Sequence, residues 1–353
     1  MKNAKPPKAQ PLAVAQFAQI LCRCAALAFR LLSRPSTLVQ LPSLVGKSLS
    51  LARPMFIIGI NNGKLAGLIQ NHTPVTFVCS HPRSGNTWMR YLLSDVLLQN
   101  HGVQTTTELP QPARLVPYYH HNLITPRAAT ATPAGYLIKT HDMIATLQER
   151  VGGHPGVRQC RYLYLFRAPE DVLVSVFHYS LLEKYIRSNS GGDIDLFCLE
   201  YLPAWMEHVT SYLDALDGGV TVYLVCYEEL LRQPATVLSD TLRWLGIPHT
   251  PAIVQRAESN MRFGKLQAME ERSFNVGGRL FRRGVEGSGA SELKPETLSQ
   301  IRAATKDIVA RANQSLARQR WKERPEPAPP SSASELAADS HNRCGETTPA
   351  SSA

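Results

Sequence analysis

The sequence predicts a single P-loop-like α/β domain with a central parallel sheet flanked by helices. Between about residues 74 and 322, short apolar runs rich in β-branched and aromatic residues alternate with helical patterns. Such alternation is typical of a parallel sheet whose crossovers are helices. Polar residues also cluster directly after each apolar run, at the position where an open α/β sheet binds its ligands.

Two flanking segments complete the predicted organisation: a basic N-terminal extension over residues 1–73 and a disordered tail, rich in Pro, Ser and Ala, over residues 323–353. The chain has 353 residues, 44% of them hydrophobic, which suffices for a large core in residues 74–322. No Asp or Glu precedes Asp95, and nine basic residues lie in the extension, which leaves 29 basic against 28 acidic residues. The net charge of +10 therefore belongs to the extension and does not indicate a nucleic-acid partner for the domain.

Within the extension, residues 12–32 are predicted to form an amphipathic, basic helix. Arg23 would lie near the bilayer centre if this stretch crossed a membrane, which disfavours a span. Three interpretations stay open: an interfacial helix on an anionic membrane surface, a targeting segment or membrane anchor, and a helix packed on the domain. We expect a cytoplasmic protein, with peripheral membrane association, organelle targeting or membrane anchoring as the alternatives.

Four apolar runs are the predicted strands, and polar residues follow each of them. The runs are Val75–Cys79, Tyr136–Lys139, Tyr162–Phe166 and Val220–Cys226. The polar clusters after them are His81–Thr87, Lys139–His141, Arg167–Asp171 and Tyr227–Glu229. Because the carboxyl ends of parallel strands meet at one edge, these clusters are predicted to form one site. The seven cysteines lack metal-ligand spacing, which argues against a zinc site or a disulfide framework.

The first polar cluster is the most informative. Residues 80–87 read SHPRSGNT and overlay the phosphate-loop pattern GxxxxGK[ST], with Asn86 where the lysine of ATP-binding loops stands. A strand followed by a Gly-containing turn and a helix aims backbone N–H groups at an anion. The positive charge has moved to Arg83, and the missing lysine argues against magnesium–nucleoside triphosphate chemistry. We therefore expect a ligand with less charge on its transferred group.

A second candidate phosphate element follows the third predicted strand. Arg167 begins a strand-to-helix turn, and Ser175 lies eight residues later on the helix. Pro169 and the acidic residues after it serve helix capping, whereas this Arg and Ser together would bind a phosphate. The Gly- and Arg-rich segment Phe263–Gly289 is predicted to be a mobile, basic loop that closes over the ligand.

Five short motifs follow one another in the order found in a known family. They are PRSGNTW (82–88), KTH (139–141), RAPEDVLVS (167–175), YEE (227–229) and RRG (282–284). Together they resemble the sulfotransferase family that uses 3′-phosphoadenosine 5′-phosphosulfate (PAPS). The resemblance implies PAPS as co-substrate, no metal, and a cofactor site formed by Arg83, Ser84, Gly85, Asn86, Thr87, Trp88, Arg167, Ser175, Tyr227, Ser259, Arg282, Arg283 and Gly284.

Transfer of a sulfuryl group to a hydroxyl needs a base for the acceptor proton and positive groups around the transferred oxygens. His141 is the predicted base because it alone among eleven histidines follows a predicted strand directly after a Lys and a Thr. Lys139, two positions earlier on the strand, projects to the same side and would stabilise developing charge. Arg83 completes the catalytic set, and an arginine that stays protonated would stabilise charge without acting as an acid.

Three departures from the family pattern bear on the cofactor contacts. Arg83 stands where the family usually has Lys, Met261 stands where it usually has an aromatic residue, and the GDW sequence that commonly follows the RKG loop is absent. Trp88 offers a flat face to an adenine, with core packing as the alternative role. The departures at Met261 and in the GDW sequence concern the adenine contacts and the loop over the ligand, and they leave the predicted phosphate contacts unchanged.

The predicted function is sulfuryl transfer from PAPS to a hydroxyl of an acceptor that the sequence does not identify: a small molecule, a lipid or a glycan. Aromatic residues such as Tyr118 and Tyr179 suit a phenol or a hydrophobic alcohol, and they suit a core equally. The alternatives are a P-loop nucleotide kinase, which Asn86 disfavours, and a non-catalytic membrane-surface adaptor. We expect no nucleic-acid partner, and the oligomeric state stays open.

Overall fold

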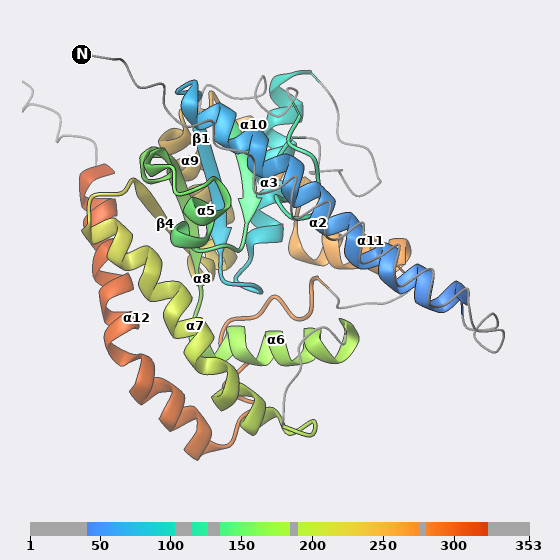
Figure 1. Ribbon diagram of the computed structural model, residues 1–353. Coiled ribbons are helices and arrows are strands. Elements are labelled where there is room, and N and C mark those ends of the chain that lie inside the picture. Colours follow the sequence, from blue (N-terminus) through green and yellow to red (C-terminus); the bar gives the residue numbers. More distant parts are fainter. Residues whose placement is uncertain (1–40, 103–114, 126–134, 184–189, 275–279, 324–353) are drawn as a thin grey trace, which may run out of the picture.

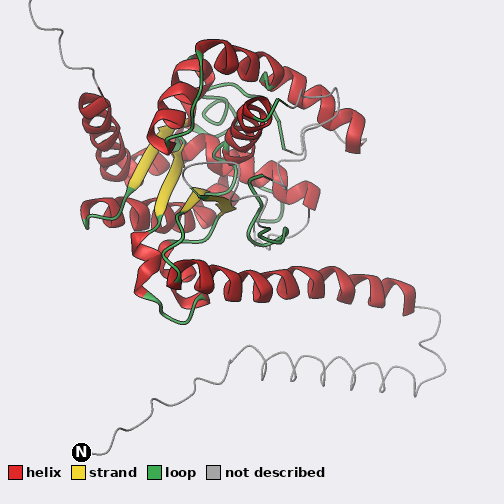
Figure 2. Cartoon of the chain, turned by 90° about the horizontal axis from the view of Figure 1, so that it is seen from above, coloured by secondary structure: helices red, strands yellow, loops and turns green. Residues whose placement is uncertain are grey.

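The computed structural model describes residues 41–102, 115–125, 135–183, 190–274 and 280–323. Figures 1 and 2 show its strands between helices that pack on both sides of the sheet. The strands are β1 (Val75–Ser80), β2 (Tyr136–Thr140), β3 (Arg161–Phe166) and β4 (Val222–Cys226). The helices are α2 (Leu41–Gln70), α3 (Asn86–Asn100), α5 (Ile144–Arg150), the 3-10 helix η3 (Pro155–Gln159), α6 (Pro169–Glu183), α7 (Ile194–Asp217), α8 (Tyr227–Arg232), α9 (Pro234–Leu245), α10 (Pro251–Asn260), α11 (Phe263–Phe274) and α12 (Pro295–Glu323).

The sheet has the order β2-β1-β3-β4, and every pairing is parallel. β1 is buried along its whole length, as expected for a central parallel strand that is covered on both faces. The chain runs from β1 to β2 on one side and then crosses to β3 on the other side of β1. The connections therefore diverge next to β1, which is where an open α/β sheet forms its ligand crevice. The predicted fold class is confirmed.

The two faces of the sheet carry separate hydrophobic cores. Along β1, Phe77 and Cys79 belong to one core and Val78 to the other, which is the period of two expected for a strand. The first core includes residues of α2, α5, α6, α7 and α12, and the second includes residues of α3, α8, α9, α10 and α11. In Figure 1, α7 and α12 lie side by side over the first face.

Part of the N-terminal extension packs on the domain through α2, a helix that no pattern in the sequence predicted. Leu65 and Ile69 of α2 lie in the first core. The Asn61 amide donates hydrogen bonds to the carbonyls of Tyr119 (2.7 Å) and Asn122 (2.9 Å). The predicted amphipathic helix at 12–32 and the predicted tail at 324–353 lie outside the described residues. None of the described helices has the length and apolar character that crossing a membrane would require.

The segment Phe263–Gly289 differs from its prediction as a mobile loop, because its first half is the helix α11. Leu266 and Met269, three residues apart, are buried on one side of this helix. This apolar spacing outweighs Gly264, so the loop prediction is wrong for residues 263–274. After residue 280 the segment is held to α6, because the N–H groups of Gly287 and Gly289 donate to the Asp171 carboxylate at 2.9 and 2.6 Å.

Candidate active site

A cavity of about 720 Å³ opens at the carboxyl edge of the sheet, where the polar clusters after the four strands meet. It brings together most of the residues predicted from the sequence. Those that line it are Arg83, Gly85, Asn86, Thr87, Trp88, Lys139, His141, Arg167, Ser175, Tyr227, Arg282, Arg283 and Gly284. Two predicted cofactor residues are not part of this lining: Ser84 is a buried residue of the loop itself, and Ser259 lies on α10.

The turn between β1 and α3 has the conformation of an anion-binding loop. Gly85 precedes the helix with a φ of 92°, and a Cβ there would lie 2.4 Å from Cδ2 of Tyr227. Only glycine fits both the backbone conformation and the close approach of the ring. Asn86, which replaces the lysine of ATP-binding loops, donates from Nδ2 to the Val78 carbonyl at 3.0 Å. Its amide nitrogen is therefore directed back to β1 and supports the turn from within.

Arg83 connects this loop to two other parts of the cavity wall. Its Nε donates to the Ser175 hydroxyl on α6 (3.0 Å), and its Nη2 donates to the Leu280 carbonyl (3.2 Å). The guanidinium carbon lies 5.0 Å from the centre of the Tyr179 ring. Burial, and then the charge of Arg167, lowers the pKa of Arg83 to about 10. Arg83 therefore stays charged at neutral pH, in agreement with a role in charge stabilisation.

Arg167 lies beside the same loop, at the start of α6. Its Nη1 donates to the Arg83 carbonyl (3.0 Å), its Nη2 lies 3.6 Å from the Asp171 carboxylate, and its guanidinium carbon lies 4.3 Å from the centre of the Tyr227 ring. Its Nε is buried and has no hydrogen-bond partner among the described atoms. A buried donor without a partner is unfavourable, so this site suits an anionic ligand that accepts from Arg167.

The two arginines of the RRG motif have a different partner. Arg282 and Arg283 both line the cavity, and both form ion pairs with Oε1 of Glu292, at 2.7 and 3.0 Å. His178 on α6 binds the other oxygen of the same carboxylate at 2.6 Å. No sequence motif indicates Glu292, because it lies beyond the RRG motif and contacts these arginines only in the folded protein. A phosphate at this position would compete with Glu292 for the two arginines.

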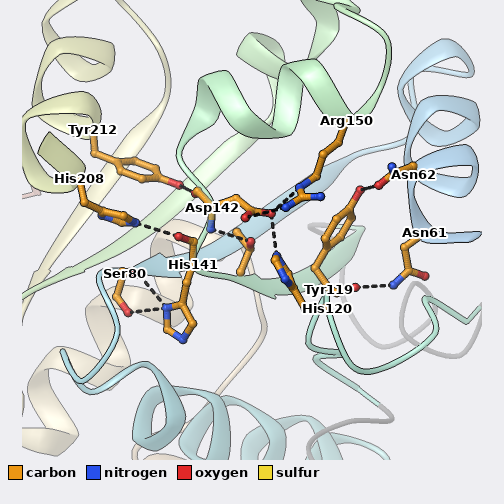
Figure 3. Close-up of polar contacts among 11 residues, drawn as sticks. Asn61, Asn62, Ser80, Tyr119, His120, His141, Asp142, Arg150, His208 and Tyr212 are labelled. Carbon is orange, nitrogen blue, oxygen red and sulfur yellow. Dashed lines mark hydrogen bonds and ion pairs between the residues drawn. The ribbon is translucent and has the colours of Figure 1, made fainter. Parts of the chain in front are cut away.

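The KTH motif occupies the end of β2 and presents a histidine in a defined tautomer (Figure 3). Nδ1 of His141 lies 2.8 Å from the Ser80 carbonyl oxygen, which can only accept, so Nδ1 carries the proton. Nε2 is left with a lone pair. Burial, and then the charge of Lys139, holds the pKa of His141 well below its ordinary value. A neutral imidazole with an unprotonated Nε2 is the form that a general base requires.

Lys139 lines the same cavity two residues before His141. Its Nζ lies 4.2 Å from the centre of the Tyr118 ring, and Tyr118 forms a bridge to the strand at this residue. Burial lowers the pKa of Lys139 to about 7, with further lowering by Arg90 and Arg83. The charge on this amine is therefore sensitive to any anion that enters the cavity.

Residues far along the chain hold the KTH motif in place, and the sequence offered no signal for them. His208 of α7 donates from Nε2 to the His141 carbonyl (3.0 Å), and its Nδ1 accepts from the Tyr164 hydroxyl (2.9 Å). Tyr212, one turn later on α7, donates to the Asp142 carbonyl at 2.7 Å (Figure 3). The end of β2 and the residues after it are thus held by β3 and α7, and their position depends on the tertiary structure.

Aromatic residues form the wall near the loop. Trp88 is buried, lines the cavity and donates from Nε1 to the Met261 carbonyl at 2.8 Å, so it serves core and cavity together. Its ring meets Tyr227 and Phe263 edge to face, with ring centres 6.3 and 6.0 Å apart. Phe263 also contacts Gly284, where a Cβ would lie 2.5 Å from the ring. Phe263 is a further candidate for base packing that the sequence motifs did not indicate.

The described ranges contain no group of three or more His, Cys, Asp or Glu side chains that could hold a metal ion. Fold and site together define an α/β protein with a phosphate-binding loop beside a candidate general base. The chain belongs to the sulfotransferase family: a family model described as "Sulfotransferase domain" matches residues 73–317. The family predicted from the five motifs is confirmed.

Relatives and solved structures agree with this membership. The chain is 27% identical to Cytosolic sulfotransferase 7 of Arabidopsis thaliana over 245 residues, which is 62% of this chain and 74% of the relative. It is 23% identical to Flavonol 3-sulfotransferase of Flaveria bidentis over 257 residues, covering 65% and 80% of the two chains. A crystal structure of retinol dehydratase in a complex with retinol and PAP superimposes with a TM-score of 0.52 at 19% identity, covering 70% of this chain and 85% of the other. This structural likeness shows a shared fold.

Proposed function

We propose that this protein transfers the sulfuryl group of PAPS to a hydroxyl of a small-molecule acceptor. The observation that carries the proposal is the presence, in one cavity, of a phosphate loop and a histidine whose Nε2 is free to accept a proton. Family membership supports the reaction class. A kinase is disfavoured, because Asn86 replaces the phosphate-binding lysine and directs its amide nitrogen to Val78.

The residues present fit the donor. The N–H groups at the start of α3, with Arg83 and Ser175, would hold the 5′-phosphosulfate, and Arg167 would bind a phosphate through donors that include its unpaired Nε. We assign Arg282, Arg283 and Gly284 to the 3′-phosphate. When this phosphate binds, it would replace Glu292 as the partner of the two arginines. Trp88, Phe263 and Tyr227 would pack around the adenine.

We assign three catalytic roles. PAPS supplies an activated sulfuryl group, whose bond to the bridging phosphate oxygen breaks as a bond from sulfur to the acceptor oxygen forms. Nε2 of His141 takes the proton of the acceptor hydroxyl. Lys139 stabilises negative charge on the transferring group, and Arg83 stabilises the charge that develops on the leaving phosphate. Arg83 does so as a permanent cation, because its pKa of about 10 is far above neutral pH.

We propose further that residues 74–322 carry this activity, supported from outside by α2, and that the protein works in the cytosol. Several relatives are named cytosolic sulfotransferases. Contact of residues 12–32 with a membrane lies outside the described structure and forms no part of the proposal.

One experiment tests donor and base together. The full chain is titrated by calorimetry with 3′-phosphoadenosine 5′-phosphate (PAP), the product of the donor, and separately with magnesium ATP. His141→Ala is compared with His101→Ala, which alters an exposed histidine at the end of α3. We expect PAP to bind tightly and ATP weakly, and His141→Ala to keep PAP affinity while transfer from PAPS falls at least about 100-fold.

Tight ATP binding without PAP binding would contradict the donor assignment. An unchanged transfer rate in His141→Ala would show that His141 is not the base. The His101→Ala control shows how much the loss of a histidine outside the cavity changes PAP affinity and the transfer rate.

A further inference from the structure

Arg90 is a cation of the cavity that the donor site does not use. It lies on α3 one turn beyond the phosphate loop, is only 8% exposed and lines the cavity. Its Nε donates to the Val116 carbonyl, and its Nη2 donates to Oδ1 of Asn122 at 3.3 Å. These partners flank Tyr118, which bridges to Lys139 on β2. Arg90 therefore lies at the β2 side of the cavity, with His141, whereas Arg167 and Tyr227 follow β3 and β4.

The charge of Arg90 lacks a compensating carboxylate in the part of the chain that the structure describes. No Asp or Glu is among the residues that line the cavity, and none of the described acidic side chains forms an ion pair with Arg90. Burial lowers the pKa of Arg90 to about 10, and only Tyr91 and Tyr118 oppose this shift. Arg90 in turn lowers the pKa of Lys139. Two cations that repel each other in one buried cavity are unfavourable unless an anion joins them.

The donor phosphates do not account for this cation. Arg83 and Arg167 are assigned to the donor phosphates, and Arg282 and Arg283 already share Glu292. Arg90 also has donors to spare, because Nη1 forms no hydrogen bond with any described residue. A planar guanidinium group with a free edge matches a carboxylate, which can accept two parallel hydrogen bonds.

We propose that Arg90 binds a carboxylate of the acceptor, so that the preferred acceptors are hydroxylated carboxylic acids. The inference rests on the proposed sulfuryl transfer and names its substrate class. The hydroxyl of such an acid lies toward His141, and the carboxylate lies toward Arg90 and Lys139 along the Tyr118 side of the cavity. Tyr118, Tyr179 and Tyr201 line the same cavity and suit an aromatic or unsaturated body between the two polar ends.

A purely structural role is the rival explanation, because Arg90 also holds the turn from Val116 to Asn122. The two roles predict different substrate effects. Loss of a structural arginine lowers kcat/KM to the same degree for every acceptor. Loss of a carboxylate partner lowers kcat/KM for acids and leaves it unchanged for their esters.

The test therefore compares 3-(4-hydroxyphenyl)propionate with its methyl ester, an uncharged compound of similar shape. The ratio of kcat/KM for acid to ester is measured at pH 7 in the full-length protein and in the Arg90→Met and Arg90→Lys variants. Arg243→Met, which removes an exposed arginine on α9, is the matched control. We expect the acid to be preferred by about 10- to 100-fold, which is the range of one charge-assisted hydrogen-bond pair.

Arg90→Met is expected to abolish this preference, and Arg90→Lys to keep part of it. Calorimetric titration of the PAP-saturated proteins with the same two compounds gives a second readout that needs no turnover. Thermal unfolding with PAP shows whether each variant is folded, and Arg90→Lys keeps the test valid should Arg90→Met fail to fold.

Sulfation of the ester without a preference for the acid would overturn the Arg90 inference and leave the proposed function standing. An equal loss for acid and ester in the Arg90 variants would also overturn it, in favour of the structural role. Absence of transfer from PAPS to any hydroxylated compound would contradict the proposed function, and the inference that depends on it.

Discussion

At the scale of single residues, hydrogen-bond geometry determines where the protons of the site are. The Ser80 carbonyl fixes a proton on Nδ1 of His141, and the His141 carbonyl fixes a proton on Nε2 of His208. The motif KTH predicted which histidine to choose, because the Lys, Thr and His follow one another on one strand. The KTH motif could not predict the roles of His208 or Arg90. These depend on contacts between distant residues, 67 positions apart for His208 and His141 and 26 for Arg90 and Val116.

Lys139 leads to a prediction about protons. Its pKa of about 7 reflects burial and the nearby cations Arg90 and Arg83, with the Tyr118 ring and the neutral His141 as its other close neighbours. A bound phosphate opposes this lowering, so the pKa rises on binding. At pH 8, between the free and bound values, Lys139 should therefore take up close to one proton when PAP binds, and PAP affinity should fall as pH rises above about 7.

Calorimetry in two buffers with different ionisation enthalpies measures this uptake, with Lys139→Met as the comparison. A binding enthalpy that is independent of the buffer in the unmodified protein would show that Lys139 does not change its protonation.

At the scale of elements, strand positions could be predicted because each apolar run is short and buried on both faces. The boundaries differ by one or two residues, as at β4, which begins at Val222 where the sequence suggested Val220. The helix α11 is not predicted, because glycine and basic residues dominate its composition and its apolar period rests on few residues, whose burial only the tertiary structure shows. β4 is a strand at one edge of the sheet, and the partner for its free backbone groups comes from a distant part of the chain. The Gln319 amide of α12 accepts from the Leu224 N–H (2.9 Å) and donates to the Leu224 carbonyl (3.0 Å).

Replacement of Gln319 by Leu should lower the free energy of unfolding by about 1–3 kcal/mol, because two backbone groups of β4 lose their partners. Gln319→Glu should have a smaller effect, since it keeps the acceptor for the Leu224 N–H. Gln255→Leu, an exposed change on α10, is the control for added apolar surface. Urea unfolding measures the differences, and equal midpoints for Gln319→Leu and Gln255→Leu would show that the amide does not stabilise the edge.

At the scale of the whole molecule, the N-terminal extension and the domain are joined through α2. Leu65 and Ile69 lie in the first core, and Asn61 bonds to the chain around residues 119–124, next to Tyr118 of the cavity. In Figure 1, α2 crosses the domain and its N-terminal half extends beyond it. Packing on the domain is one of the three interpretations open for residues 12–32, which lie outside the described residues, and α2 shows such packing for another part of the extension.

Two deletions should therefore behave differently. Removal of residues 1–54 keeps the described contacts of α2, and removal of residues 1–70 loses three buried aliphatic side chains (Ile57, Leu65 and Ile69) and the Asn61 hydrogen bonds. We expect the second deletion to lower the free energy of unfolding by on the order of 5 kcal/mol relative to the first. Thermal unfolding measures this difference. Equal stability of the two proteins would mean that α2 packs on the domain without stabilising it.

The sequence by itself determined the strands, the phosphate loop and the family, because these depend on neighbouring residues whose spacing sets backbone conformation and local chemistry. The tertiary structure alone decided that the Asn86 amide nitrogen is directed to Val78, that Arg282 and Arg283 share Glu292, and that Arg90 is buried in the same cavity as Lys139. These features arise where distant segments meet, and burial there sets the pKa values and the charge balance of the cavity.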